Sequence, residues 1–129
     1  PQRPMTVTEG IYPINNPDEN ARVLVTTNFA LTYFIVSGEI EASKVPTWLL
    51  IKDSEGLSVL TAWAAGKFAG DDVGMFVKKS GITDKVKHQE LVIPGYAAAI
   101  VGDVEEELPG WTITVGPREA AHIPGFLRA

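Results

Sequence analysis

Short β-branched apolar runs alternate along the chain with longer segments of helical composition. The first run, 23–25, is uniformly apolar and too short for a surface strand, which predicts a central strand covered on both faces. The polar residues Thr26, Thr27 and Asn28 follow it directly. Apolar residues then recur at mixed helical spacing over 29–36, which predicts a helix buried on more than one side.

The same alternation continues to the end of the chain. Further strands are predicted over the apolar runs 48–53, 57–61, 90–96 and 111–115. Helices are predicted over the intervening segments 62–68, 71–81, 97–108 and from 116 onward. Because strands alternate with helices of ordinary length, the sequence predicts a single α/β domain of the Rossmann-like (flavodoxin-like) class, with a mostly parallel sheet and helices on both faces.

Residues 1–20 differ from the rest of the chain because prolines and glycine interrupt a polar segment. They predict an extended lead-in or an interdomain linker before a domain that spans 21–129. The chain starts at Pro1 without an initiator methionine, so we expect a piece of a longer protein.

Small or polar residues follow each predicted strand. Because the carboxyl ends of parallel strands meet at one edge of a sheet, we expect these turns to form a broad platform rich in backbone N–H groups. Gly95 and Gly116 are expected to let the backbone approach a ligand, and Pro117 fits the first turn of a helix. Arg118 and Glu119 in that turn are either a surface ion pair or contacts to ligand amides. A large flat ligand suits such a platform better than a compact phosphate.

Composition narrows the possible functions. A net charge of −5 and a pI near 4.9 argue against a nucleic-acid or anionic-membrane surface. The absence of cysteine excludes a disulfide, a Cys-ligated iron-sulfur cluster and a thiol nucleophile in this chain. No apolar stretch has the roughly 18–20 residues that span a bilayer, and the polar start is no signal peptide, so we expect a cytoplasmic protein.

Candidate catalytic residues are few. The sequence has no dinucleotide fingerprint, no P-loop and no Asp-rich metal motif. His88 and His122 lie in no metal-ligand spacing and are predicted to be surface or packing residues. Ser58 lacks a nucleophile-elbow pattern. We therefore expect no protein catalytic residue and no metal ligand in this chain.

Four segments together identify a family. TTNFALTYFIVSGEIEASKVP, LSVLTAWAAGKF, LVIPGYAA and VGPREAAHIPGFL, in this order, resemble the carboxy-terminal corrinoid-binding domain of the large subunit of the corrinoid iron-sulfur protein. That subunit is also called the gamma subunit of the acetyl-CoA decarbonylase/synthase complex. The resemblance extends from about Arg22 to the end of the chain.

The resemblance implies a function. The family binds a base-off corrinoid (cobamide), which carries a methyl group between a methyltransferase and acetyl-CoA synthase in the reductive acetyl-CoA pathway. It implies as partners the remainder of the large subunit with its iron-sulfur and barrel domains, the small subunit, the methyltransferase, acetyl-CoA synthase and a reductive activator. No protein residue binds cobalt axially in this family, and this chain likewise lacks the D-x-H-x-x-G signature of His-on corrinoid proteins.

The resemblance also implies which residues bind the cofactor. One loop would lie under the corrin ring, with Thr61 as a weak polar neighbour of cobalt: Leu57, Ser58, Val59, Leu60, Thr61 and Ala62. Thr27, Asn28 and Thr32 would bond amides of the macrocycle. The nucleotide tail and the opposite ring edge would be lined by Gly95, Tyr96, Gly116, Pro117, Arg118, Glu119 and Ala120.

Two alternatives remain open from the residues alone. The polar turns suit a flavin or another nucleotide equally well, and a visible absorption spectrum would distinguish corrin from flavin. The chain is alternatively a cofactor-free docking module in which Trp63, Phe68 and Phe126 contact a partner.

Overall fold

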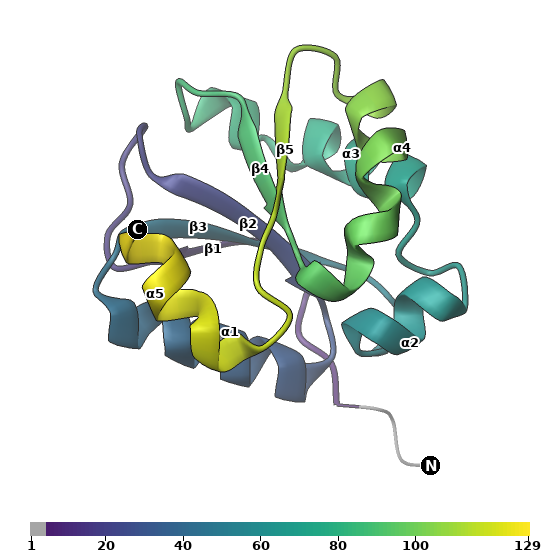
Figure 1. Cartoon of the computed structure of the whole chain (residues 1–129), viewed down its shortest axis with the longest axis horizontal. Coiled ribbons are helices and arrows are strands. Elements are labelled where there is room, and N and C mark those ends of the chain that lie inside the picture. The colour runs from purple at the N-terminus through teal and green to yellow at the C-terminus, as the bar shows by residue number, and fades with distance from the viewer. Residues whose placement is uncertain (1–4) are drawn as a thin grey trace.

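The computed structural model of the chain describes residues 5–129 and is shown in Figure 1. Its strands are β1 (Gly10–Ile14), β2 (Arg22–Thr27), β3 (Thr47–Lys52), β4 (Glu90–Ile93) and β5 (Thr112–Val115). Its α-helices are α1 (Ala30–Ser43), α2 (Val59–Ala64), α3 (Gly70–Ser80), α4 (Val101–Glu107) and α5 (Ile123–Arg128). Short 3₁₀ helices are η1 (Ile82–Asp84), η2 (Gly95–Ile100) and η3 (Ala120–His122).

The strands form one sheet in the order β1-β3-β2-β4-β5. The four strands β3, β2, β4 and β5 are parallel, and only β1 runs antiparallel, at the edge beside β3. The predicted α/β class with a mostly parallel sheet is therefore confirmed, and the parallel strands have the order of a flavodoxin-like fold.

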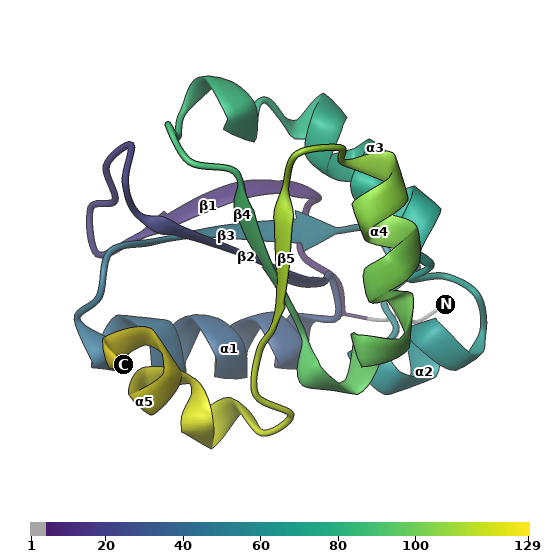
Figure 2. The same ribbon diagram turned by 45° about the horizontal axis from the view of Figure 1, so that its top comes forward.

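The central strand β2 shows how the sequence builds the two faces of the sheet. Val23 and Val25 point into a core formed with α2, α3 and α4, whereas Leu24 points into a second core formed with α1 and α5. Figure 2 shows α1 and α5 on one side of the sheet and α3 and α4 on the other. Because successive strand side chains point to opposite faces, a continuous apolar run is what a strand covered on both faces requires.

The order of the connections creates a switch point beside β2. After β2 the chain passes through α1 to β3 on one side, and after β3 it returns through α2 and α3 to β4 on the other side. In open α/β sheets the loops diverge at such a point and leave a crevice outside the carboxyl ends of the strands. The fold therefore places a ligand crevice between β2 and β4.

Some predicted elements were wrong. The segment 57–61 is not a strand, because α2 begins at Val59 after an extended Ser58 at its N-cap. Both edges of β3 are already paired, one with β1 and one with β2, so a strand following β3 has no place beside it. The segment instead starts the two-helix crossover to β4.

Helix boundaries also differ from the prediction near the carboxyl end. The predicted helix over 97–108 is divided into η2 and α4, with a non-helical Ala97 (φ −104°, ψ 19°). Pro117, Arg118 and Glu119 do not form the first turn of a helix but an irregular loop that ends at η3. Pro124, in the first turn of α5, is the proline that starts a helix here.

The amino-terminal segment was predicted to be extended, but its pairing was not foreseen. Within the described part of 1–20, β1 pairs with β3 from Gly10↔Ile51 to Ile14↔Thr47. Its isoleucines pack against the two cores, so this segment contributes an edge strand to the sheet.

The helix α1 is less buried than its apolar sequence predicted. Leu31 is 55% and Phe34 74% exposed, because the sheet, η3 and α5 cover other side chains of this helix. Phe68, which the docking alternative placed at a partner surface, is instead fully buried in the core beside α3. Within 5–129, the helices are too short or too polar to cross a bilayer.

Candidate functional site

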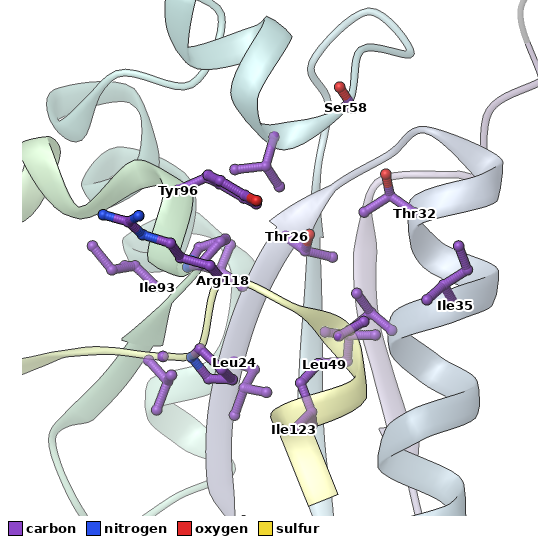
Figure 3. Close-up of a pocket in the computed structure, with 18 of the residues that line it drawn as sticks. Leu24, Thr26, Thr32, Ile35, Leu49, Ser58, Ile93, Tyr96, Arg118 and Ile123 are labelled. Atoms are coloured by element: carbon purple, nitrogen blue, oxygen red, sulfur yellow. The ribbon is translucent and has the colours of Figure 1, made fainter. Parts of the chain in front are cut away.

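A cavity of about 290 Å³ lies at the switch point, where the carboxyl end of β2 meets the loops that follow β3, β4 and β5 (Figure 3). It is lined by Leu24, Val25, Thr26, Thr32, Ile35, Val36, Leu49, Ser58, Val59, Leu60, Val92, Ile93, Pro94, Tyr96, Gly116, Pro117, Arg118, Ala120 and Ile123. Its size is close to the lower limit of small-molecule pockets, which suits one part of a larger ligand.

The walls of the cavity are mostly apolar. Leu24, Leu49, Val92 and Ile123 belong to the core between the sheet and α1 and α5. Val25 and Ile93 belong to the core on the other face of the sheet, so both cores contribute to the wall. Figure 3 shows Thr32 and Ile35 of α1 on one side and Tyr96 and Arg118 on the other. The polar side chains at the mouth are few, so the cavity is suited to a flat, weakly polar group.

The structure brings together many of the residues that the sequence predicted for the site. Those that line the cavity are Thr32, Ser58, Val59, Leu60, Tyr96, Gly116, Pro117, Arg118 and Ala120. They come from α1, the start of α2 with the loop before it, η2, and the loop between β5 and η3 with the start of η3. These segments lie far apart in the sequence, and the parallel sheet collects them at one edge.

The other predicted residues lie outside the cavity. They are Thr27, Asn28, Leu57, Thr61, Ala62, Gly95 and Glu119. Ala62 is fully buried in the core beneath α2, and the half-buried Leu57 packs against the same core. Thr61 is exposed beside the mouth, where its hydroxyl accepts a hydrogen bond from Ser58 Oγ over 3.1 Å. Thr61 is therefore on the rim rather than in the wall.

Thr27 is fully buried at the end of β2. It follows Val23 and Val25 in the strand alternation and so points to the face of the sheet that α2, α3 and α4 cover. Among the described residues its hydroxyl has no hydrogen-bond partner. Burying an unpaired hydroxyl costs free energy, so Thr27 is a local weak point of β2.

Asn28 has its hydrogen-bonding groups directed at the loop after β3. Its Oδ1 accepts from the backbone N–H groups of Ser54 and Gly56, over 2.9 and 3.1 Å, and from Ser54 Oγ over 3.0 Å. Its Nδ2 donates to Asp53 Oδ1 over 3.1 Å and to the Val7 carbonyl over 3.4 Å. In this structure the side chain is therefore hydrogen-bonded to the loop after β3, while the macrocycle contact expected from the resemblance stays a prediction.

The two glycines are explained by contact between loops. A β-carbon on Gly95 would lie 2.7 Å from the backbone nitrogen of Arg118 and 2.7 Å from the carbonyl oxygen of Gly116. A β-carbon on Gly116 would lie 3.0 Å from Val92 Cγ1. The loops after β4 and β5 therefore need glycine to pack on each other, which is a different reason from close approach to a ligand.

An acidic and an aromatic side chain interact at the mouth of the cavity. The Tyr96 hydroxyl donates to Glu119 Oε1 over 3.0 Å, and the Arg118 guanidinium carbon lies 6.0 Å from the Tyr96 ring centroid. The hydrogen bond to the Glu119 carboxylate, followed by its negative charge, raises the pKa of Tyr96. Glu119 thus restrains the Tyr96 ring at the mouth of the cavity.

The histidines are placed away from the cavity wall. His88 precedes β4 at the opposite edge of the sheet, where Nδ1 accepts from the Glu90 N–H over 3.1 Å and Nε2 lies 2.6 Å from the Ala21 carbonyl. His122 is exposed at the N-cap of α5. Over 5–129 no group of three His, Asp or Glu side chains could hold a metal ion.

Sequence reasoning missed much of the apolar wall. Ile35 and Val36 share a face of α1 with Thr32, which helical spacing alone could have shown. Thr26 follows Leu24 in the strand alternation and lines the cavity with it. Val92 and Ile123 had no such signal, because only the packing of distant elements brings them to the cavity.

Comparisons with known proteins agree over nearly the whole chain. A family model described as CO dehydrogenase/acetyl-CoA synthase delta subunit matches residues 1–127. The chain is 48% identical over 129 residues to the corrinoid/iron-sulfur protein large subunit of Moorella thermoacetica. It is 46% identical over 127 residues to the acetyl-CoA decarbonylase/synthase complex subunit gamma of Methanopyrus kandleri, and 41% over 128 residues to that of Methanocaldococcus jannaschii.

The matches cover 100%, 98% and 99% of this chain, respectively, but only 29%, 27% and 26% of those relatives. The chain therefore spans less than a third of the length of the curated relatives that it matches.

Proposed function

Because the chain belongs to the family described as CO dehydrogenase/acetyl-CoA synthase delta subunit, we propose that it binds a base-off corrinoid as part of a methyl carrier. In this proposal the corrinoid carries a methyl group between a methyltransferase and acetyl-CoA synthase. The placement as the carboxy-terminal corrinoid-binding domain of a gamma-type large subunit is supported by the similarity to such subunits over nearly all of this chain.

The observation that carries the proposal is the cavity between β2 and β4. It combines an apolar interior with a rim of hydroxyl and backbone groups at the switch point of the sheet. Such a site fits a cofactor that has a planar base and a larger amide-bearing ring, because the base can enter the cavity while the ring stays at the rim. The residues present therefore fit a corrinoid.

Each part of the site has a proposed task. Leu24, Val92 and Ile123 would enclose the base of the nucleotide tail and exclude water from it. Ser58, Leu60 and the adjacent Thr61 would lie under the ring, and Thr32 would donate to a ring amide. The loop Gly116–Ala120, together with Tyr96, would contact the tail and the opposite edge of the ring.

A corrinoid supplies, when bound, a cobalt centre that accepts and releases a methyl group. The contribution of this chain is to bind it without an axial ligand of its own, since a strong ligand would favour the oxidised states of cobalt. Among the residues of 5–129 that line the cavity, none has an imidazole, a thiol or a carboxylate. Both ring nitrogens of His88 already have backbone partners at the other edge of the sheet.

The proposal includes partners outside this chain. A remainder of the large subunit with an iron-sulfur cluster, a small subunit, a methyltransferase, acetyl-CoA synthase and a reductive activator would complete the methyl carrier. Leu60 is 50% and Tyr96 40% exposed, and both line the cavity. Trp63, also on α2, is 40% exposed. Exposed apolar side chains in this position agree with a site that another protein covers.

Titration of the chain with cob(II)alamin, cob(II)inamide and flavin mononucleotide tests the proposal. We expect both corrinoids to bind, with an electron paramagnetic resonance spectrum of bound cob(II)alamin that lacks nitrogen coupling from an axial ligand. Flavin mononucleotide should not compete. Binding of the flavin alone, or nitrogen coupling in the bound corrinoid, would contradict it.

A further inference from the structure

The loop between β3 and α2 ends at Ser58, where the chain reaches the rim of the cavity. This loop, residues 53–58, has two consecutive residues with left-handed backbone angles, Glu55 (φ 59°) and Gly56 (φ 79°). A left-handed glutamate is an unfavourable conformation for a residue with a side chain, so the loop does not hold this shape through its local sequence alone.

Several of the contacts that hold the loop converge on one buried side chain. Asn28 Oδ1 receives the backbone N–H groups of Ser54 and Gly56, and Asn28 Nδ2 donates to Asp53 Oδ1. Asn28 is only 6% exposed and Ser54 only 1% exposed. Hydrogen bonds protected from water in this way resist competition from solvent, and they fix the two N–H groups that flank the left-handed Glu55.

The fixed turn is connected directly to the cavity rim. Ser54 Oγ lies 2.9 Å from the Leu57 carbonyl, and Ser58, the next residue, is the N-cap of α2. Ser58 Oγ in turn donates to Thr61 Oγ1. Asn28 at the end of β2 is thus linked to the cavity rim through Ser54, Leu57 and Ser58, by short contacts between residues that are adjacent in space.

We propose that Asn28 is a positioning residue, which does not contact the cofactor but fixes the loop 53–58 and thereby places Ser58 and Leu60 at the mouth of the cavity. This inference rests on the proposed function of the cavity. It assigns to Asn28 a role in ligand affinity that acts through the conformation of another segment, and it explains why a polar side chain is buried at the end of a central strand.

The test compares Asn28→Ala with Leu108→Ala in the same 129-residue chain. Leu108 is 3% exposed in the core on the other face of the sheet and does not line the cavity, so its truncation lowers stability without touching the loop. Hydrogen exchange at the Ser54 and Gly56 amides and the affinity for cob(II)inamide are measured for both variants, beside the melting temperature.

We expect Asn28→Ala to accelerate hydrogen exchange at the Ser54 and Gly56 amides and to weaken cob(II)inamide binding. Each change should be at least about tenfold, because the variant loses more than one buried hydrogen bond. Leu108→Ala should leave the affinity within about twofold, since the loop stays in place. Ser54→Ala removes only the hydroxyl contact, so its effect on affinity should lie between the two.

The outcomes separate this inference from the proposed function. Unchanged exchange at Ser54 and Gly56 in Asn28→Ala, or an affinity loss no larger than that of Leu108→Ala, would overturn the role of Asn28. A wild-type chain that binds neither cob(II)alamin nor cob(II)inamide would contradict the proposed function, and the exchange rates would then decide the assignment of Asn28 to the loop.

Discussion

The backbone N–H of Gly95 donates a hydrogen bond to the carbonyl oxygen of Pro117 over 3.3 Å, which joins the loop after β4 to the loop after β5. The return contact is the Gly116 N–H, which donates to the Ile93 carbonyl over 2.8 Å. Both loops line the cavity, so this paired contact closes one side of its mouth.

Replacement of Gly95 by alanine should separate these loops. The new β-carbon would lie within 2.8 Å of three backbone atoms, which cannot move aside as a flexible side chain can. We expect a loss of about 3 kcal/mol in the free energy of unfolding, at the upper end for overpacking, measured by urea denaturation. Gly102→Ala is the control, because a β-carbon at this position of α4 meets open space. This variant should raise the free energy of unfolding by about 0.5–1 kcal/mol, since alanine favours a helix more than glycine does.

Replacement of Thr27 by valine should stabilise the chain. The substitution keeps the shape of the side chain and removes a buried hydroxyl that has no partner among the described residues, so we expect a gain of about 1 kcal/mol in thermal or urea denaturation. The matched control is Thr47→Val, because the equally buried Thr47 hydroxyl donates to the Val45 carbonyl over 3.0 Å. That variant should lose about 0.5–1.5 kcal/mol. Equal effects in both variants would show that Thr27 has a partner.

A bulky residue at Thr61 should weaken corrinoid binding without unfolding the chain. Thr61 is exposed on the first turns of α2 beside Ser58, so a tryptophan there meets solvent in the free protein but the ring in the proposed complex. We expect Thr61→Trp to lower cob(II)inamide affinity by about ten- to hundredfold, with an unchanged melting temperature.

Met75→Trp provides the comparison for an exposed tryptophan on another helix. Met75 is 44% exposed on α3 and lies outside the cavity. It should bind cob(II)inamide as the wild type does. Wild-type affinity of Thr61→Trp for cob(II)inamide would contradict the proposal that the start of α2 lies against the corrin ring.

Neither histidine should coordinate cobalt. His122→Ala and His88→Ala should give the same spectrum of bound cob(II)alamin as the wild type, because neither imidazole lines the cavity. His88→Ala should still lose about 1–3 kcal/mol of stability, since the Ala21 carbonyl and the Glu90 N–H lose their partner. A change in the axial-ligand signals of either variant would contradict this expectation.

The pKa of Tyr96 should depend on Glu119. The carboxylate raises the pKa of Tyr96 above the usual 10.0, so Glu119→Gln should lower it towards that value. Because the pKa of Tyr96 is raised in the folded chain, its hydrogen bond to Glu119 stabilises the fold fully at a pH below the pKa of the unfolded chain. This stabilisation is lost as the pH rises through the pKa of the folded chain.

Site-resolved NMR titration of Tyr96 is the suitable measurement, because burial, followed by the nearby Tyr33, also raises the pKa of Tyr12 and would obscure a total absorbance titration. Glu106→Gln, at an exposed position of α4, should leave the pKa of Tyr96 unchanged. An unchanged pKa in Glu119→Gln would mean that the hydrogen bond does not persist in solution.

The sequence determined the parts of this fold that depend on local pattern. The apolar run Val23–Val25 requires a strand covered on both faces, and the left-handed Gly81 (φ 88°) ends α3 as predicted. The four motif segments also indicated the protein family, and the comparisons confirm that the chain belongs to it. These features are readable because periodicity and terminal residues act over a few neighbouring positions.

The tertiary structure alone decided which segments meet. The apolar run 57–61 has strand-like composition, yet both edges of β3 are occupied and its residues start α2. The resemblance predicts a cofactor contact for Asn28, and only the structure shows that its side chain holds the loop at Ser54 and Gly56. Strand order and packing between distant residues set these outcomes, and the free energy of such contacts is not encoded in the periodicity of any single segment.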